Sequence, residues 1–380
     1  MIIAAILSSV SLLGWLYLAF FHGQFWRPQF DEQAQMPPSW PSVDIVIHAH
    51  DEANVLRQTL PFLFAQNYAG NWRLILVDDH SQDGTAAIAT KIAADEHQSN
   101  RLVCVETPDI PDGWNRKVFA LNAGVEQSAA EYILFTEPDI QHPMDNIRQL
   151  ISRAIESKFD LVSQLAKMNC QSVIENIFVP ASVFFFAMVH PFRRSNDPDR
   201  STAAAGQVML VKQRALHNIG GLARIKSAVA VNCELAKAIK TSGGEKETPG
   251  KTWISFSKQV KCLSRFFDFR DAWKMIVTST LVSQYRSMLS VVMTIIGGFI
   301  LFLVPIILPA SGWPMATEMG LGAWFIMTVI YATIILFYDL SLAWAFTLPA
   351  AGLVYIAAVT RQIWHLRPKS NGLSTDKPPS

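Results

Sequence analysis

The sequence predicts an α/β domain built on a mostly parallel sheet, with membrane-spanning helices at both ends of the chain. Two observations predict the sheet: short apolar runs alternate with segments of helical pattern, and two of these runs end in carboxylates. A third observation predicts the spans. The chain has 32 Lys and Arg residues, and none of them lies in residues 1–22 or 288–360, which are also apolar.

The first predicted unit, residues 1–22, is an N-terminal membrane anchor. About twenty apolar residues are enough to cross roughly 30 Å of hydrocarbon. A cleaved signal peptide is the alternative, but no Lys or Arg precedes Arg27, and the apolar stretch ends in bulky Phe20 and Phe21 instead of a small-residue cleavage site. We therefore expect the anchor to be retained.

Residues 40–262 form the predicted α/β domain, which follows a Pro-containing linker. In its first half, four expected strands alternate with three expected helices. The strands are Val43–Ile47, Leu74–Val77, Leu102–Glu106 and Tyr132–Thr136, and the helices are Asn54–Ala65, Gly84–Ala94 and Val118–Glu126. Such alternation is typical of a mostly parallel sheet with helices on its faces.

The region after residue 262 divides into three further predicted units. Residues 263–287 mix aromatic and basic side chains, which is typical of a helix at a membrane interface. Residues 288–360 contain two or three transmembrane segments, and residues 361–380 form a polar tail. The apolar segment Ile177–Phe192 is short for a span and is followed by arginines, so we expect it to be interfacial too, with a buried core helix as the alternative.

The distribution of positive charge predicts how the chain is oriented. Because Lys and Arg are dense in residues 23–287, we expect the α/β domain on the cytoplasmic side. Basic residues from Arg361 onward favour the same side for the C-terminus. An even number of spans would place that end outside, so we expect either a re-entrant C-terminal segment or an anchor that lies in the interface.

Composition argues against several other classes of protein. The formal net charge is +1, and no basic stripe with interleaved aromatic residues is found, so we expect no nucleic-acid partner. The four cysteines are far apart and form no CxxC pair, so neither structural zinc nor a disulfide framework is expected. No GxGxxG follows the first strand, which argues against a dinucleotide-dependent oxidoreductase.

Acidic residues follow two of the predicted strands. Asp78 and Asp79 end the second strand, and Glu137 and Asp139 follow the strand at Tyr132–Thr136. Because open α/β sheets bind ligands at the carboxyl ends of their strands, these acids are expected to share one crevice. A negatively charged crevice suits a divalent cation and, through it, a phosphate.

These motifs resemble those of family 2 glycosyltransferases with the GT-A fold. The matching stretches are Val77-Asp-Asp-x-Ser-x-Asp-Gly-Thr85, Lys117-Val-Phe-Ala-Leu-Asn-Ala-Gly124 and the later acidic triplet. The segments around Asn196–Thr202 and Ala203–Val211, together with the apolar ends, are similar to the hopene-associated glycosyltransferases of bacterial hopanoid clusters. The resemblance covers roughly residues 5–360.

The resemblance implies a membrane glycosyltransferase that moves a sugar from a nucleotide-sugar donor to a lipid acceptor such as a hopanoid. It implies a multi-pass protein of the bacterial inner (cytoplasmic) membrane, with its catalytic domain in the cytoplasm. It also implies a divalent cation, Mg²⁺ or Mn²⁺, which stabilises the charge that grows on the departing diphosphate. By resemblance Asp139 contacts this metal, and Glu137 stands where the family usually has Asp.

Other site residues follow from the same resemblance. Asp78 or Asp79 is expected to accept hydrogen bonds from the nucleobase, and Lys117 to approach the diphosphate or ribose. For Asp51 and Glu52, near the end of the first strand, a nucleotide contact and a capping role both remain open.

The chain departs from the family where the catalytic base is expected. Val231 and Asn232 align with an acidic pair, one member of which is the general base in relatives, and neither Val nor Asn takes up a proton. Glu234 is the nearby candidate for a catalytic replacement, although on a helix it lies roughly 200° around the axis from position 232. A catalytically impaired relative, which binds nucleotide or lipid as an assembly partner, is therefore the alternative function.

Two histidines also depart from the family pattern. His48 and His50 stand where Pro and an aromatic residue or Arg are usual. Residues two apart on a strand face the same way and could bind a metal. Because no third ligand has suitable spacing, we expect hydrogen-bonded histidines of the core or sheet edge instead.

Overall fold

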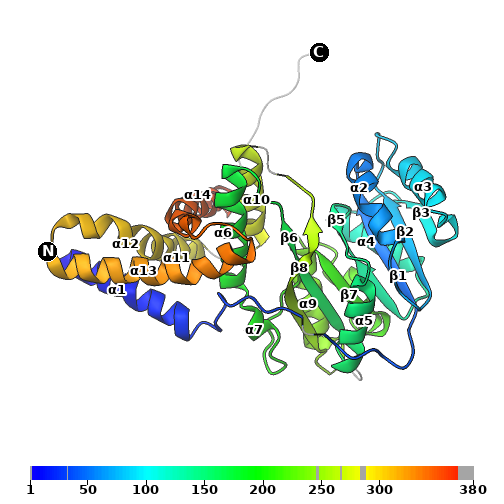
Figure 1. Ribbon diagram of the computed structural model, residues 1–380, viewed down its shortest axis with the longest axis horizontal. Helices are drawn as coiled ribbons and strands as arrows, with labels where there is room; N and C mark the ends of the chain where they lie inside the picture. The colour runs from blue at the N-terminus through cyan, green and yellow to red at the C-terminus, as the bar shows by residue number, and fades with distance from the viewer. Residues whose placement is uncertain (1, 32, 245–247, 266–267, 283–287, 367–380) are drawn as a thin grey trace, which may run out of the picture.

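The computed structural model describes residues 2–31, 33–244, 248–265, 268–282 and 288–366 (Figure 1). Within these residues the α/β domain contains one eight-stranded sheet in the order β3-β2-β1-β4-β7-β6-β8-β5. The strands are β1 Val43–Ala49, β2 Trp72–Asp78, β3 Leu102–Glu106, β4 Tyr132–Phe135, β5 Ile140–Gln141, β6 Leu161–Met168, β7 Val208–Lys212 and β8 Thr252–Cys262.

Helices cover both faces of this sheet and form the membrane region. In the α/β domain they are α2 Ala53–Phe64, α3 Thr85–Asp95, α4 Arg116–Glu126, α5 Asn146–Glu156, α7 Phe192–Ser195, α8 Gln213–Asn218 and α9 Val231–Ser242. The apolar region contains α1 Ile2–Phe20, α6 Val173–Val189, α10 Phe269–Val282, α11 Met288–Gly298, α12 Val304–Ile307, α13 Pro314–Phe337 and α14 Leu348–Leu366.

The sheet is mixed, and its parallel half is the part that the sequence predicts. β1 pairs in parallel with β2 and β4, and β2 pairs in parallel with β3. β7 runs antiparallel to both β4 and β6, while β5 runs antiparallel to β8. The expected strands and helices of the first half are confirmed to within two residues at each end. The carboxyl ends of β1, β2 and β4 therefore lie at one edge of the sheet, as an acid-lined crevice requires.

Alternating side chains of the strands form two apolar cores. On β1, Ile45 packs into the core on one face and Val46 into the core on the other, and both are fully buried. Helix α4 comes very close to the sheet at Gly124, where a Cβ would lie 2.6 Å from Cγ1 of Val46. Glycine is therefore required for this packing, which fixes α4 against the strands that carry the acids.

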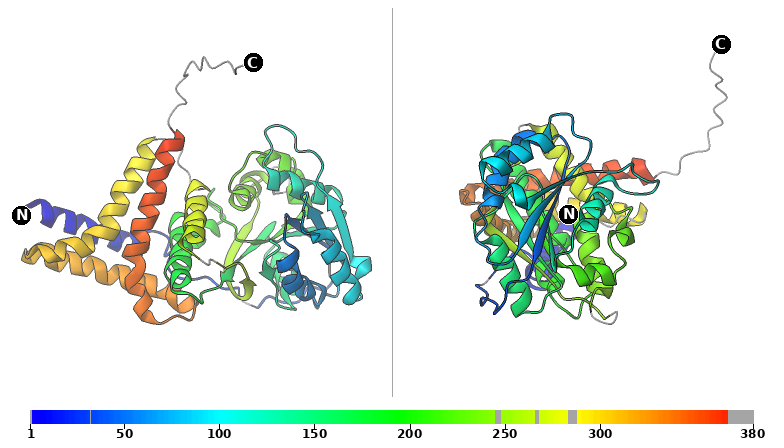
Figure 2. Two further views of the ribbon diagram at one scale, coloured as in Figure 1. Left: turned by 90° about the horizontal axis from the view of Figure 1, so that it is seen from above. Right: turned by 90° about the vertical axis from the view of Figure 1, so that its right-hand side faces the viewer.

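The apolar ends of the chain come together in a membrane region beside the α/β domain. Helix α1 packs along α13 (Figures 1 and 2), so the two ends of the chain form one bundle. In the part of the chain that the structure describes, four helical segments are long and apolar enough to cross a membrane: Ile2–Phe20, Met288–Ser311, Pro314–Phe337 and Leu342–Arg361. The expectation of apolar helices at both ends that can span a membrane is confirmed.

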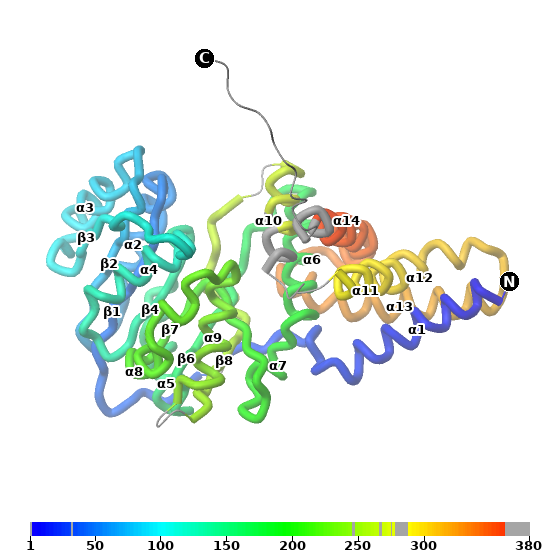
Figure 3. Tube along the Cα trace, turned by 180° about the vertical axis from the view of Figure 1, so that it is seen from behind, coloured from blue at the N-terminus to red at the C-terminus, as the bar shows by residue number. Residues whose placement is uncertain are grey.

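Helix α6 is a core helix, so the interfacial position expected for Ile177–Phe192 is wrong for this segment. Phe184 and Phe185 are buried against Phe25, Tyr331 and Tyr355. Helix α6 itself lies between the α/β domain and the bundle of apolar helices (Figure 3). The sequence could not show this because the helices that cover α6 lie up to 180 residues away in the chain.

The arginines that follow α6 hold the end of the anchor. Arg193 donates a hydrogen bond to Oε1 of Gln24 at 2.6 Å, and Arg194 donates to the carbonyl oxygen of Phe21 at 2.8 Å. Their guanidinium groups are therefore bonded to the chain itself, and the short α7 joins α1 to the α/β domain.

Helix α14 differs in direction from α1 and α13 (Figure 2). It runs across α1 and α13 (Figure 2) and packs on α10, α11 and α6 next to the α/β domain (Figure 3). Gly352 allows this contact, since a Cβ there would lie 2.7 Å from the Phe302 ring. The polar tail expected from residue 361 begins later, because α14 continues to Leu366. The rest of the predicted tail lies outside the described residues.

We predict that Phe184→Ala destabilises the whole protein. Removing a fully buried ring leaves a cavity where α6 meets the membrane helices, which typically costs about 3–5 kcal/mol. A lower thermal unfolding midpoint of the detergent-solubilised protein would show this. Phe325→Ala is the matched control, because 70% of Phe325 is exposed on α13. Equal midpoints for the two variants would contradict the assignment of α6 as a core helix.

Candidate active site

The loop after β1 and the loop after β2 lie at the edge of the sheet where the acids gather. Hydrogen bonds from backbone N–H groups join these two loops. After β1, the Asp51 N–H donates to Oγ of Ser81 at 3.0 Å, and Oδ1 of Asp51 accepts from the Gln82 N–H at 2.7 Å. The Ala53 N–H donates to Oδ2 of Asp83 at 2.9 Å. These bonds give Asp51 a structural role in this arrangement, since its carboxylate holds the loop after β2.

Asp83 and Thr85 also organise the start of α3. Oδ1 of Asp83 accepts from both the N–H and the hydroxyl of Thr85, at 3.0 and 2.5 Å. Gly84 stands before the helix with φ +78°, a conformation that glycine adopts without strain. The Asp83 carboxylate thus holds Thr85, the first residue of α3.

Asp79 is buried at the end of β2, and its charge is compensated from two sides. Arg116 donates to Oδ2 through Nε at 2.5 Å, and Nε2 of His48 lies 3.0 Å from the same oxygen. Burial alone raises the pKa of this carboxyl, but hydrogen bonds from Arg116 and His48 outweigh burial, so the pKa lies below its ordinary value. His48 is thus hydrogen-bonded, as expected.

The two aspartates proposed for the nucleobase differ in their surroundings. Asp78 is half-buried, and its Oδ1 accepts from the Ser81 N–H at 3.0 Å. For Asp79, Oδ2 is occupied by Arg116 and His48, while Oδ1 is buried without a hydrogen-bond partner among the described residues. Which of the two carboxylates contacts a nucleobase therefore stays a prediction.

Lys117 faces the acid that follows β4. It forms an ion pair with Glu137, and its place is set by Asn115, which caps α4 by accepting from the N–H groups of Lys117 and Val118. The first acid of the triplet is thus neutralised by the lysine that the sequence assigns to the nucleotide. A phosphate entering here would compete with Glu137 for the ammonium group.

Asp139 is held by the end of strand β8, which the sequence did not link to it. Its Oδ2 accepts hydrogen bonds from Sγ of Cys262 at 3.1 Å and Oγ of Ser264 at 2.5 Å. The antiparallel pairing of β5 with β8 places these residues beside the acid, since Ile140 pairs with Cys262. Nothing in the local sequence near Asp139 indicates this contact, because the partners lie more than 120 residues further on.

The pKa of Glu52 is strongly shifted by its surroundings at this edge of the sheet. Burial, followed by the negative charges of Asp139, Asp83 and Glu137, raises its pKa to about 7. The carboxylates of both loops are therefore close enough to repel one another. Divalent cations such as Mg²⁺ and Mn²⁺ prefer oxygen ligands and would relieve this repulsion, so the side chains at this edge fit such a metal. In the described part of the chain no three His, Cys, Asp or Glu side chains form a ready-made metal cluster.

A small cavity beside Lys117 and Glu137 is lined by further residues of the candidate site. Its lining includes His48, Lys117, Glu137, Gln207 and Asn232. The Asn232 side chain donates from Nδ2 to the Gly206 carbonyl oxygen at 2.8 Å, which fixes the start of α9 against this cavity.

Glu234 does not line this cavity. It lies in the first turn of α9 and is exposed. Position 232 therefore faces the gathered site residues and position 234 faces solvent, as the helical geometry predicts. The role of Glu234 as a replacement base stays a prediction.

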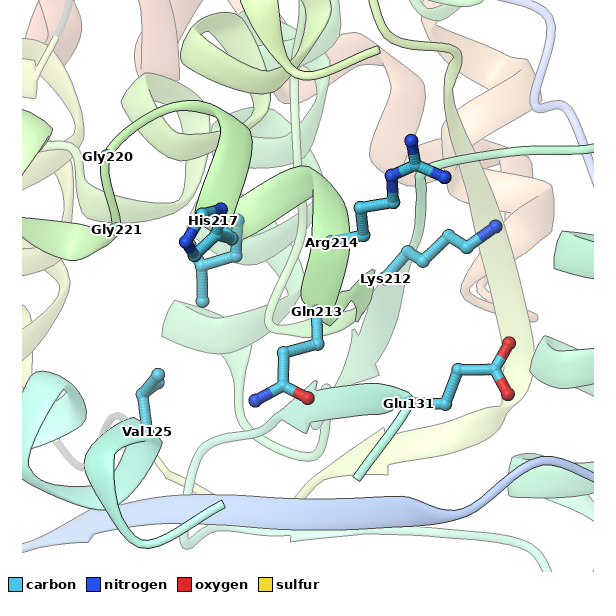
Figure 4. A pocket seen from close by; sticks show the side chains of 9 residues that line it. Val125, Glu131, Lys212, Gln213, Arg214, His217, Gly220 and Gly221 are labelled. Carbon is cyan, nitrogen blue, oxygen red and sulfur yellow. The ribbon is translucent and has the colours of Figure 1, made fainter. Parts of the chain in front are cut away.

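A much larger cavity lies at the opposite edge of the sheet. It has a volume of about 760 Å³ and is lined by residues at the start of β4 and the end of β7, among them Glu131, Lys212 and His217 (Figure 4). None of the candidate site residues borders it. The gathering of acids, and not the size of a cavity, therefore identifies the candidate site.

Sequence reasoning missed three contributors to this site. Arg116, Cys262 and Ser264 each contact one of the predicted acids. The sequence could have indicated Arg116, because it directly precedes Lys117 at the start of the same helix. For Cys262 and Ser264 the sequence offers none.

The protein has the GT-A fold. Its α/β domain has a mixed sheet with acids at the ends of its strands, and apolar helices are attached to this domain. The mannosyltransferase PcManGT from Pyrobaculum calidifontis, in complex with GDP-Man and Mn²⁺, has this fold. It aligns over 96% of this chain and 99% of its own, with a TM-score of 0.57 and 16% identity. Residues 44–219 match the family described as Glycosyl transferase family 2.

Two curated proteins share part of the same domain. EpsE of Bacillus subtilis (strain 168), which is named as a glycosyltransferase, is 30% identical over 102 residues, or 27% of this chain and 34% of EpsE. The undecaprenyl-phosphate 4-deoxy-4-formamido-L-arabinose transferase of Pectobacterium carotovorum subsp. carotovorum (strain PC1) is 27% identical over 130 residues, or 32% of this chain and 36% of that protein. The chain thus spans about a third of the length of these relatives.

We predict that Glu52→Gln stabilises the protein above pH 4.5, and most strongly above pH 7. Folding raises the pKa of Glu52 from 4.5 to about 7, so its contribution to stability is fully present below pH 4.5 and is lost as the pH rises through 7. Glutamine mimics the protonated form. The thermal unfolding midpoint, measured without divalent metal, should therefore exceed that of the wild type at pH 8 and equal it at pH 4.

The control for this prediction is Glu96→Gln. Glu96 is exposed where α3 ends, and its substitution should leave the pH dependence of the midpoint unchanged. A Glu52→Gln profile parallel to that of the wild type from pH 4 to pH 8 would show that the acids at this edge do not repel Glu52.

Proposed function

We propose that the protein is a membrane glycosyltransferase that transfers a sugar from a nucleotide-sugar donor to a lipid acceptor. One observation carries the proposal: within the segment that matches family 2, acids from the ends of β1, β2 and β4 converge with Lys117 at one edge of the sheet. Such an edge binds a phosphate-containing ligand when a cation and a lysine offset the negative charge of the acids.

The donor would bind across this edge with its diphosphate near Lys117. Asp139, with Glu137 beside it, would hold a divalent cation that stabilises negative charge on the diphosphate. Ser264 and Cys262 orient the Asp139 carboxylate by hydrogen bonds. The ion pair of Lys117 with Glu137 keeps the lysine near the phosphates before the donor enters.

A lipid acceptor is supported by the connection between the site and the membrane helices. Arg265, which follows Ser264, lies 3.7 Å from Oε1 of Glu175, at the start of α6. The candidate site is thus continuous with helices that pack in the apolar region. The Pectobacterium relative is also named for a lipid-linked molecule, undecaprenyl phosphate. Among lipids we propose a hopanoid as the first acceptor to test, because the motifs around Ala203–Val211 resemble hopene-associated enzymes.

A catalytically impaired relative remains the second candidate function. Asn232 faces the site cavity where an acid is expected, and its amide is bonded to the Gly206 carbonyl oxygen. A protein of this kind would bind nucleotide at the same edge without turning it over.

We further propose that α14 lies on the cytoplasmic surface of the membrane and that α1, α11–α12 and α13 are the spans. Support comes from the direction of α14, which crosses α1 and α13 beside the α/β domain (Figure 2). The turn after α13 also lies on the domain side, since Asp339 accepts a hydrogen bond from Lys167 of β6 at 2.5 Å. This topology places the α/β domain and Arg361 on one side, as the positive charges favour.

We predict metal-dependent transfer of sugar to lipid. Full-length protein in nanodiscs is incubated with radiolabelled UDP- and GDP-sugars and native membrane lipids, and label in the lipid fraction is counted with Mn²⁺, with Mg²⁺ and with EDTA. Asp139→Asn should reduce the metal-dependent transfer at least about tenfold. Asp95→Asn, an exposed acid at the end of α3, should not.

Two outcomes would contradict parts of this proposal. Transfer that is equal in EDTA would show that the metal assignment is wrong. Nucleotide binding without transfer to any lipid, for every donor, would favour the catalytically impaired relative.

We predict that positions 311 and 361 are on opposite sides of the membrane. Cys104 is the exposed native cysteine, so Cys104→Ser provides the background for Ser311→Cys and Arg361→Cys. A membrane-impermeant maleimide applied to spheroplasts should label only the cysteine at 311. In inverted vesicles it should label only the cysteine at 361. Labelling at 361 in spheroplasts would show instead that α14 spans the membrane.

A further inference from the structure

The cavity between β1, α4 and α9 holds few groups that can take up a proton. Of its lining residues, His48, Lys117 and Glu137 are titratable, while Asn232 and Gln207 carry neutral amides. Lys117 and Glu137 are bound to each other in an ion pair. A carboxylate paired with an ammonium group is a weakened base, and a protonated lysine is no base at all.

His48 is different because only one of its ring nitrogens is engaged. Nε2 lies 3.0 Å from Oδ2 of Asp79, and the described residues offer no hydrogen bond to Nδ1. A carboxylate accepts a hydrogen bond, so the neutral imidazole carries its proton on Nε2 and leaves the lone pair of Nδ1 available. His48 lines this cavity, and 18% of its side chain is exposed.

Asp79 is well suited to orient this imidazole. It is fully buried, and Arg116 fixes the same oxygen at 2.5 Å, so the carboxylate has no freedom to turn away. It also stabilises an imidazolium ion if the ring takes up a second proton. Charged groups face His48 from three elements: Asp79 of β2, Lys117 of α4 and Glu137 after β4.

We propose that His48, oriented by Asp79, is the general base that takes the proton of the acceptor hydroxyl. The inference rests on the proposed function. The acceptor O–H bond breaks and its proton moves to Nδ1 of His48. The acceptor oxygen forms a bond to the anomeric carbon of the sugar. The bond from that carbon to the diphosphate oxygen breaks, and its electron pair leaves with the nucleoside diphosphate. His48 then returns its proton to water.

The position of Asn232 agrees with this assignment. It borders the same cavity as His48, so a base on β1 would act in the space that an acid at position 232 would serve. The imidazole would thus supply, from the opposite wall, the basicity that an amide at position 232 lacks. Base catalysis typically contributes about 10²–10⁴-fold to the rate.

The test uses full-length protein in nanodiscs and measures turnover of the nucleotide-sugar donor, either to native lipids or to water. His48→Gln should reduce kcat by about 10²–10⁴-fold, with little change in donor Kd. His217→Gln is the matched control, because His217 lies at the opposite edge of the sheet (Figure 4). Thermal midpoints of all variants report whether they fold.

Two rescues separate a base from a structural residue. Imidazole added to His48→Ala should restore part of the turnover in proportion to the concentration of its neutral form. Asn232→Asp introduced into His48→Gln should also raise kcat, because it places a carboxylate on the same cavity. The acidic limb of the kcat profile, which reports protonation of the base, should be lost in His48→Gln.

The outcomes distinguish this inference from the proposed function. A folded His48→Gln that keeps wild-type kcat, or that loses only donor affinity, overturns the role of His48 and leaves the transferase intact. Turnover lost without rescue by either imidazole or Asn232→Asp also overturns it. A wild type that binds donor but neither transfers nor hydrolyses the sugar overturns the proposed function and this inference with it.

Discussion

The buried charge of Asp79 is the interaction on which the candidate site depends. A carboxylate without access to water is costly unless it is paired and hydrogen-bonded, and here Arg116 and His48 meet that demand. The three residues belong to α4, β1 and the end of β2, so compensating one charge fixes the relative positions of three elements. Lys117 follows Arg116 directly at the start of α4, which Asn115 caps, and it pairs with Glu137.

The other acids of the candidate site destabilise one another, whereas Asp79 is stabilised by its partners. Glu52 lies close to Asp139, Asp83 and Glu137, and its pKa is raised first by burial and then by the negative charges of these acids. The fold therefore stores unfavourable electrostatic energy at one edge of the sheet. Local charge repulsion of this kind is tolerated where a ligand relieves it, and a cation with a diphosphate is such a ligand.

Much of the parallel half of the sheet could be predicted because its signals are local. Buried strands such as Leu74–Val77 appear as apolar runs, and the acids after them are adjacent in sequence. The remainder depends on contacts between distant segments. Neither the bond from Ser264 to Asp139 nor the burial of Phe184 between the domain and the bundle has a local signature. At Asn232 the helical period correctly predicted which residue faces the site and which faces solvent.

The short path from Cys262 to Arg265 has a geometric consequence for any acceptor. Cys262 binds Asp139, Arg265 pairs with Glu175 on α6, and three peptide units between them span at most about 11 Å. α6 itself is anchored among the bundle helices by Phe184 and Phe185. With the membrane topology proposed above, this connection would hold the candidate site at a fixed height above the bilayer. Acceptors would then be selected by how far their reactive hydroxyl emerges from the lipid, before any contact recognises their shape.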